Sequence, residues 1–261
     1  MKRVICLICI YFCITLIMIS PAEAGWTTVY QEDFSSDPGW TTNNEDHYFW
    51  DMLPQAYYQK EIDDSDEYSY KTLPGLQAGM TWRLEYDLYP ARFDWAGDAR
   101  LGFVDSDLYI ESEEGLHPQW MSIIFAKIDQ GYVPIIRWLT SEGNSGGYEY
   151  SSNRFTPGTW YNILFEYDPD ASQIYTLMKE RESGTILVED TLSVIGTFTS
   201  DIDRLAMSTL SDDYAPGATG GATGISYIDN ITVSQIPAPG AIILGGIGAG
   251  FIGWLRRKKA I

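Results

Sequence analysis

Between residues 25 and 235 the chain consists of many short runs in which apolar and polar residues alternate. The clearest run covers residues 81–89, where every second residue from Trp82 to Leu88 is apolar and the residues between them are charged. Successive side chains of a β-strand point to opposite faces. The run therefore predicts a strand with one buried face and one face in water.

Nine further runs with a similar pattern predict strands. They cover residues 26–31, 100–104, 121–128, 133–139, 160–167, 173–181, 186–191, 202–208 and 225–233. Turn sequences rich in Gly, Pro and Asp separate several of them. No run has the period of a helix. The sequence therefore predicts an all-β fold, a two-sheet antiparallel β-sandwich (jelly roll) that residues 25–235 form as one domain.

Three segments resemble the jelly rolls of concanavalin A-like and laminin G-like domains. Residues 154–161 read Arg-Phe-Thr-Pro-Gly-Thr-Trp-Tyr, residues 165–168 read Phe-Glu-Tyr-Asp, and residues 227–231 read Tyr-Ile-Asp-Asn-Ile. In those domains a strand that follows Pro-Gly precedes a hairpin. A strand with the third of these patterns is the last strand of the fold. The order of these elements matches over most of residues 25–235, so the resemblance implies that fold more than a particular function.

Residues 1–24 have the pattern of a signal peptide. Lys2 and Arg3 precede a long apolar run, and residues 22–24, Ala-Glu-Ala, provide small side chains around a cleavage point. We therefore expect signal peptidase to release a mature protein that begins near Gly25.

Residues 236–261 have the pattern of a membrane anchor. Pro237, Ala238 and Pro239 precede an uncharged, mostly apolar stretch that ends at Leu255. As a helix, this stretch would be about 28 Å long, close to the thickness of a hydrocarbon core. Four basic residues follow it: Arg256, Arg257, Lys258 and Lys259. Basic residues at such a position stay in the cytoplasm, so the domain would lie outside the cell.

The succession of proline motif, glycine-containing apolar helix and basic end resembles a PEP-CTERM sorting signal, with Ala238 where that signal commonly has Glu. The resemblance implies that an exosortase-type processing protease in the membrane cuts near the proline motif. We therefore expect an exported protein that this transmembrane helix anchors at least transiently, before the protein reaches the cell surface or the extracellular matrix.

Charge and cysteine content narrow the function of the predicted domain. The chain has a formal net charge of −19, and removing the six basic residues and one acidic residue of the two terminal segments leaves about −24. Such a surface repels nucleic acid, so no nucleic acid partner is expected, and it attracts divalent cations. Cys6, Cys9 and Cys13 all lie in the predicted signal peptide. The mature protein would therefore have no disulfide, catalytic thiol or cysteine-ligated metal.

Two catalytic patterns are incomplete. Glu61 and Asp63 begin a segment close to the E-x-D-x-x-E pattern of laminarinase-like glycoside hydrolases, but Asp66 stands at the last position. The family packs the intervening residues into its core, where Asp64 would be an unpaired charge, so we interpret the segment as a solvated acidic loop. Residues 143–147 fit G-x-S-x-G, but no helical pattern follows, and we interpret them as a flexible loop.

Acidic residues near the two ends of the domain resemble the calcium-binding ends of carbohydrate-binding jelly rolls. Glu32 and Asp33 follow the first predicted strand, and Asp229 lies in the last. These strands are often adjacent in a jelly roll, and Ca²⁺ prefers oxygen ligands. The resemblance implies a structural Ca²⁺ bound by Glu32, Asp33 and Asp229. Alternatively, the three carboxylates are solvated at a sheet edge.

Aromatic residues make up 14% of the chain, and exposed rings bind sugars by stacking against their C–H faces. Six of them near turn sequences are candidate carbohydrate-binding residues: Trp40, Trp50, Tyr57, Tyr58, Trp95 and Tyr148. The sequence favours a non-catalytic extracellular or cell-surface protein that binds a carbohydrate, with extracellular polysaccharide as its partner. A structural or adhesive matrix protein without a small ligand is the alternative, and an endo-glucanase-like glycoside hydrolase is the third hypothesis.

Overall fold

A computed structural model describes residues 25–62, 68–73, 79–93, 98–105, 119–128, 131–199, 202–208 and 223–236. Nearly all of them belong to one compact unit, Thr28–Gln235. The predicted signal peptide and the sorting signal from Pro237 onward lie outside the described residues. Within the described ranges, no helix has the length and apolar character needed to cross a membrane.

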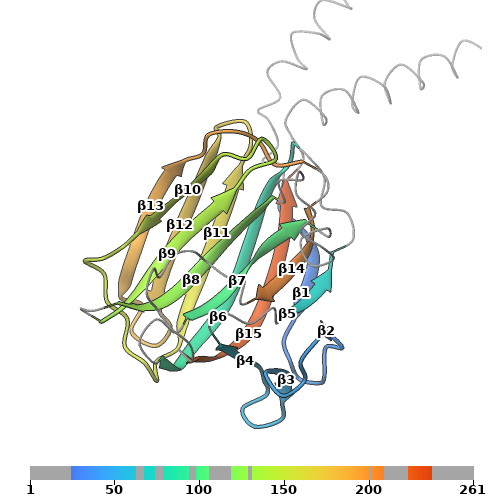
Figure 1. Cartoon of the computed structure of the whole chain (residues 1–261), viewed down its shortest axis with the longest axis vertical. Coiled ribbons are helices and arrows are strands. Elements are labelled where there is room, and N and C mark those ends of the chain that lie inside the picture. The colour runs from blue at the N-terminus through green and yellow to red at the C-terminus, as the bar shows by residue number, and fades with distance from the viewer. Residues whose placement is uncertain are drawn as a thin grey trace, which may run out of the picture. The chain divides into compact units, whose positions relative to one another are not determined.

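The described chain is all-β and forms two antiparallel sheets (Figure 1). The eight-stranded sheet has the order β13 (Ile186–Ser193), β12 (Gln173–Glu180), β11 (Tyr161–Asp168), β6 (Thr81–Phe93), β15 (Thr223–Ile236), β4 (Ala56–Ile62) and β3 (Tyr48–Asp51). Its remaining strand, β1 (Thr27–Glu32), also pairs with β15. The first and last strands of the domain are therefore neighbours.

The seven-stranded sheet packs against the first sheet. Its order is β10 (Ser145–Glu149), β9 (Gly131–Leu139), β8 (Trp120–Ile128), β7 (Asp98–Asp105), β14 (Ile202–Ser208), β5 (Tyr68–Thr72) and β2 (Thr41–Thr42). All ten strands predicted from the alternation are confirmed, with ends that shift by four residues or fewer. Strands β2, β3, β4, β5 and β10 were not predicted.

Strand β10 corrects the interpretation of residues 143–147 as a flexible loop. Ser145 to Glu149 pair with β9 in regular register, and Gly146 lies opposite Trp138. A Cβ atom at Gly146 would clash with the indole ring of Trp138. Glycine therefore allows the edge strand to lie close to a large side chain of its neighbour.

The two sheets enclose one hydrophobic core. On β6, Trp82, Leu84, Tyr86 and Leu88 are all at most 3% exposed, which matches the predicted buried face of this strand. The Trp82 ring lies 5.9 Å from that of Phe103 on β7, in the opposite sheet. Burying each such side chain contributes about 1.5–3 kcal/mol. The other face of the eight-stranded sheet, here called the outer face, is turned away from this core.

Strand β15 has an irregularity that affects the outer face. Ile228 and Ile231 are both buried, although only two residues separate them. Asn230, between them, has a φ of 52°, a left-handed conformation that Asn tolerates better than most residues. The strand thus accommodates one extra residue, as in a β-bulge, and Asp229 and Asn230 both lie on the outer side.

Candidate functional site

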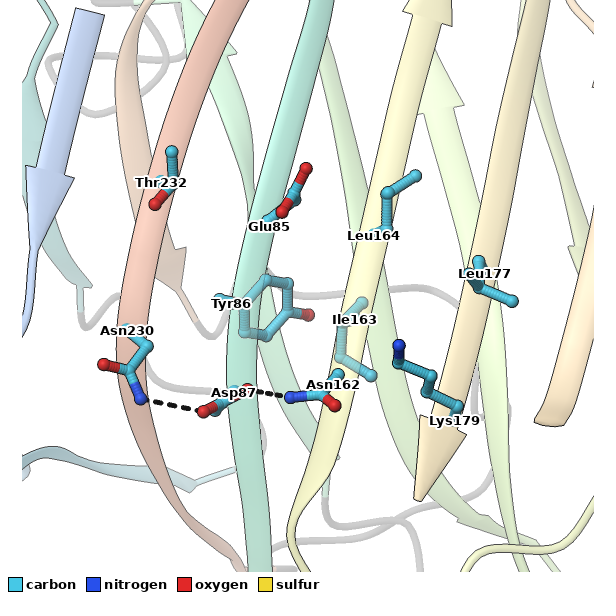
Figure 2. A pocket seen from close by; sticks show the side chains of 10 residues that line it. All are labelled: Glu85, Tyr86, Asp87, Asn162, Ile163, Leu164, Leu177, Lys179, Asn230 and Thr232. Carbon is cyan, nitrogen blue, oxygen red and sulfur yellow. Dashed lines mark hydrogen bonds between the residues drawn. The ribbon is translucent and has the colours of Figure 1, made fainter. Parts of the chain in front are cut away.

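A pocket of about 300 Å³ lies on the outer face, across β15, β6, β11 and β12 (Figure 2). This is at the small end of the volumes that bind small molecules in proteins. Its lining residues come from four strands: Glu85, Tyr86, Asp87, Asn162, Ile163, Leu164, Leu177, Lys179, Asn230 and Thr232. The pocket therefore depends on the sheet order and not on one segment of sequence.

The strand register brings these side chains together in rows across the sheet. Asn162 on β11 lies opposite Asp87 on β6 and opposite Lys179 on β12. In the next row along β11, Leu164 lies opposite Leu177 on β12. The pocket consequently has one polar row and, beside it, a partly apolar row.

Asp87 is the centre of the polar row, and only 6% of it is exposed. Asn230 Nδ2 donates to Asp87 Oδ2 over 2.8 Å, and Asn162 Nδ2 donates to Asp87 Oδ1 (Figure 2). Arg181 Nη1 lies 3.1 Å from Asp87 Oδ2. A buried carboxylate is costly unless hydrogen bonds and a counter-charge satisfy it. These contacts supply both, and they fix the orientation of the two amides.

Five aromatic side chains cross the sheet beside this pocket. This aromatic row consists of Trp160, which immediately precedes β11, Tyr89 on β6, Tyr227 on β15, Tyr58 on β4 and Phe49 on β3. Neighbouring ring centroids in the row are 4.5 to 6.1 Å apart. Trp160 and Tyr89 lie two positions from Asn162 and Asp87 on their chains, so the row borders the pocket.

The rings of the row are inclined to one another. Phe49 and Tyr58 are stacked at 26°, whereas the Tyr58 and Tyr227 rings meet at 70°. Cross-strand aromatic pairs of this kind stabilise a sheet by about 0.2–1 kcal/mol each. Phe49 is 37% exposed, and the other four side chains are partly exposed. The row therefore both stabilises the sheet and leaves part of its aromatic surface in contact with solvent.

Arg181 connects the pocket with the aromatic row. Its guanidinium carbon lies 5.6 Å from the centre of the Trp160 ring, and the same group pairs with Asp87. Burial raises the pKa values of the Tyr58 and Tyr227 hydroxyls. The combined surface offers hydroxyls, amides, carboxylates and apolar side chains within one area of the sheet.

Three of the six aromatic residues proposed from the sequence, Trp40, Tyr57 and Trp50, pack in or against the core. Trp40 and Tyr57 are 7% and 2% exposed, with ring centroids 5.1 Å apart in the core. Trp50 packs partly against this core and donates from Nε1 to the carbonyl oxygen of Phe34 over 2.8 Å. Trp40 and Tyr57 are core side chains and have no free ring face for a sugar.

The other three have different surroundings. Tyr58 belongs to the aromatic row. Tyr148 is 51% exposed on β10, in the other sheet, where its ring lies 4.7 Å from that of Tyr150. Trp95 lies outside the described residues. The structure thus places Tyr58, and none of the other described candidates, in the aromatic row.

The residues proposed for calcium use their oxygens locally. The Phe34 amide donates to Glu32 Oε1 over 3.1 Å, and the Ser35 amide donates to Asp33 Oδ1 over 3.0 Å. The Ser35 amide and hydroxyl also lower the pKa of Asp33. Burial raises the pKa of Asp229, which Asn230 contacts through its backbone and side-chain nitrogens. Among the described residues no three His, Cys, Asp or Glu side chains form a metal-binding group. Calcium binding by Glu32, Asp33 and Asp229 stays a prediction.

The sequence alone did not identify the polar row or most of the aromatic row. Alternation in residues 81–89 places Asp87 on the solvent side of its strand, which was a usable signal. It gives no indication that Asn162 and Asn230 are neighbours of Asp87, because they lie 75 and 143 residues further along the chain.

No protein-family model matches the sequence, and no curated protein is significantly similar to it. Solved structures do match the fold. The CBM2 module of the evolved Dit protein of Lactobacillus casei BL23 phage J-1 has a TM-score of 0.54 at 12% identity, over 82% of this chain and 97% of the module.

Two lectins of winged bean are also similar. The acidic lectin, solved with methyl-α-D-galactose, has a TM-score of 0.52 at 9% identity, over 81% of this chain and 98% of the lectin. The basic lectin, solved with Tn antigen, has a TM-score of 0.51 at 10% identity, over 82% of this chain and all of the lectin. The chain therefore shares the jelly-roll sandwich fold that its sequence resembles.

Proposed function

We propose that this chain is a non-catalytic carbohydrate-binding protein, with the pocket and the aromatic row on the outer face of the eight-stranded sheet as its binding surface. The observation that carries the proposal is the pocket organised by Asp87, with the aromatic row along its border. Protein sites bind sugars through hydrogen bonds to hydroxyls and through contacts of apolar side chains with C–H groups. The fold shared with a carbohydrate-binding module and two lectins supports this proposal.

A glycan array probed with the full-length protein and two variants tests the proposal. Trp160→Ala removes one end of the aromatic row, and Asn162→Ala removes an amide of the pocket. We expect each to weaken binding about tenfold or more, which corresponds to ~1.4 kcal/mol. The matched control is Tyr175→Ala, because Tyr175 is an aromatic residue on β12 that belongs neither to the row nor to the pocket lining.

If the array shows no binding to any glycan, the structural or adhesive matrix protein becomes the better hypothesis. Binding that Trp160→Ala and Asn162→Ala leave unchanged would mean that a glycan binds elsewhere on the chain.

The arrangement of the carboxylates supports a protein without hydrolase activity. Glu85 and Asp87 both line the pocket from β6, which is the observation that favours an endo-glucanase-like alternative. However, Asn162, Asn230 and Arg181 engage both oxygens of Asp87. We expect no release of reducing sugar from β-glucans. Release that Glu85→Gln abolishes would favour the hydrolase.

We also propose export and transient anchoring, on the basis of the terminal sequence patterns. Residues 1–24 would be removed by signal peptidase, and an exosortase-type protease would cut near Pro237. Mass spectrometry of the protein recovered from the cell surface should find a C-terminus near Pro237. A mature protein that retains Ile261 would contradict the processing.

A further inference from the structure

We infer that the pocket selects uncharged glycans over glycans that carry carboxylate or amino groups, and that Asp87 is the positioning residue for this selection. The inference rests on the proposed function and specifies its ligand class. Asp87 acts through the two amides that it orients, those of Asn162 and Asn230 (Figure 2).

The two arginines near the pocket, Arg83 and Arg181, are already paired with carboxylates. Arg83 donates to Glu166 Oε2 from Nη2 over 2.7 Å and from Nε over 3.0 Å. Arg181 lies 3.1 Å from Asp87 and also covers the Trp160 ring. Lys179 is the cation among the lining residues, and Glu85 and Asp87 line the same pocket. Because Arg181 balances Asp87, the charges of Glu85 and Lys179 cancel within the lining, so an anionic sugar would gain no net attraction there and would meet a chain of net charge −19.

The hydrogen-bonding groups of the two amides match a hydroxyl better than a carboxylate. Asn230 Nδ2 donates both to Asp87 and to Asp229 Oδ2, the latter over 3.0 Å, so Asn230 offers the pocket an acceptor, its Oδ1. Asn162 uses one N–H on Asp87 and retains the other together with its Oδ1. A hydroxyl both donates and accepts and can use all three of these groups, whereas a carboxylate only accepts and could use only the Asn162 N–H.

An ammonium group gains little from Asp87. Both oxygens of this carboxylate accept from the amides, and the Arg181 guanidinium balances its charge. On the other side of the pocket, Leu164 and Leu177 provide an apolar surface for the C–H groups of a sugar ring. An uncharged sugar with neighbouring hydroxyls can hydrogen-bond to the amides of the polar row and pack its C–H groups against the two leucines.

The test measures retention of soluble polysaccharides by immobilised full-length protein at about 0.15 M salt, where the Debye length is ~8 Å and distant charges are screened. The neutral probes are β-1,3-glucan, β-1,4-glucan, mannan and galactan. The acidic probes are alginate, polygalacturonate and polyglucuronate, and the amino-sugar probe is chitosan.

Three variants and one control accompany the wild type. Asn162→Ala and Asn230→Gly remove the two amides, and glycine keeps the positive φ at position 230 without strain. Asp87→Asn retains the size of the side chain but cannot accept from all three donors, and it leaves Arg181 without its carboxylate. Gln173→Ala, at the exposed start of β12, is the matched control for loss of an amide outside the pocket.

We expect the wild type to retain at least one neutral polysaccharide and none of the charged ones. Asn162→Ala and Asn230→Gly should each lower the affinity for the neutral glycan about tenfold, and Gln173→Ala should leave it unchanged. Asp87→Asn should lose neutral binding and gain retention of an acidic probe, a change that a merely structural role would not produce.

Equal or tighter retention of an acidic probe or chitosan, weakened by Asn162→Ala, would overturn the inference while the proposed function stands. If no probe is retained, or if retention is insensitive to Asn162→Ala and Trp160→Ala, the proposed function fails and the inference fails with it. If Asp87→Asn does not fold, the two amide variants decide alone, and neutral binding that survives both contradicts the selection.

Discussion

Tyr57 and Tyr58 are neighbours in sequence but belong to opposite faces of β4. Tyr57 is 2% exposed, and its hydroxyl lies 2.8 Å from Ser69 Oγ inside the core. Tyr58 is part of the aromatic row, with its ring 5.5 Å from that of Tyr227. Both were proposed as carbohydrate-binding residues because they lie near turn sequences. The difference shows that strand parity, and not proximity to a turn, decides which rings face a ligand.

The same contrast holds for whole layers of the molecule. Aromatic clusters with neighbouring ring centroids about 5 to 6 Å apart occur on both sides of the eight-stranded sheet. Inside, the rings contribute mainly through burial and close packing. On the outer face, the rings are only partly buried and lie near pocket amides that can make further hydrogen bonds. We therefore expect inner substitutions to affect stability, and substitutions in the pocket or the aromatic row to affect binding.

The largest effect is expected for Trp82→Ala. Trp82 is 1% exposed and contacts Phe103 of the opposite sheet, so its loss leaves a cavity between the sheets. The free energy of unfolding should fall by about 3–5 kcal/mol. Denaturant unfolding measures this change, with Tyr175→Ala on the outer face as control. A loss for Trp82→Ala no larger than that for the control would remove the distinction between the two layers.

The two neighbouring tyrosines allow a finer comparison. Tyr57→Phe leaves the Ser69 hydroxyl, which is 0% exposed, without its tyrosine partner and should cost about 1–3 kcal/mol. Tyr58→Phe removes a hydroxyl on the outer face and should change stability by no more than about 0.5 kcal/mol. Thermal unfolding of both variants checks the difference. Similar costs would indicate that the face of β4 does not determine the role of its hydroxyls.

The smallest effect concerns a polar contact at the surface, between the β9–β10 turn and the segment after β13. The Thr197 amide and hydroxyl donate to Glu142 over 2.8 and 2.7 Å, and they lower the pKa of Glu142 from 4.5 to about 2. A folded-state pKa below the unfolded value stabilises the fold above pH 4.5, and this stabilisation is lost as the pH falls toward 2.

Glu142→Gln should therefore lower the melting temperature slightly near neutral pH, and the difference from the wild type should disappear as the pH falls from 4.5 toward 2. Melting curves of the wild type and the variant between these two pH values measure the difference. Parallel curves would show that the Thr197 contact does not contribute to the fold.

The ten predicted strands were accessible from sequence because their buried positions are apolar. Strands β4 and β5 were missed for a physical reason, since Gln59 and Ser69 occupy buried positions and interrupt the alternation. The Tyr57 hydroxyl forms a hydrogen bond with the Ser69 hydroxyl, which explains why the core tolerates Ser69. A pattern that counts only apolar residues cannot identify such strands.

The site was less predictable than the fold. Asp87, Asn162 and Asn230 come from three strands, and their contacts depend on the order of those strands in the sheet. Local alternation assigns each residue to a face but gives no information about its neighbours across the sheet. The bulge at Asn230 is a second feature that local alternation does not predict. The extra residue turns the Asn230 amide toward Asp87.

An NMR titration tests most directly whether the outer face binds a glycan. The side-chain amide signals of the full-length protein would be followed while a neutral glycan retained in the polysaccharide screen is added. We predict that the signals of Asn162 and Asn230 shift with saturation and that the signal of Gln173, outside the pocket, stays in place. Saturable shifts confined to amides elsewhere on the chain, with both pocket asparagines unchanged, would contradict the assignment of this face as the binding surface.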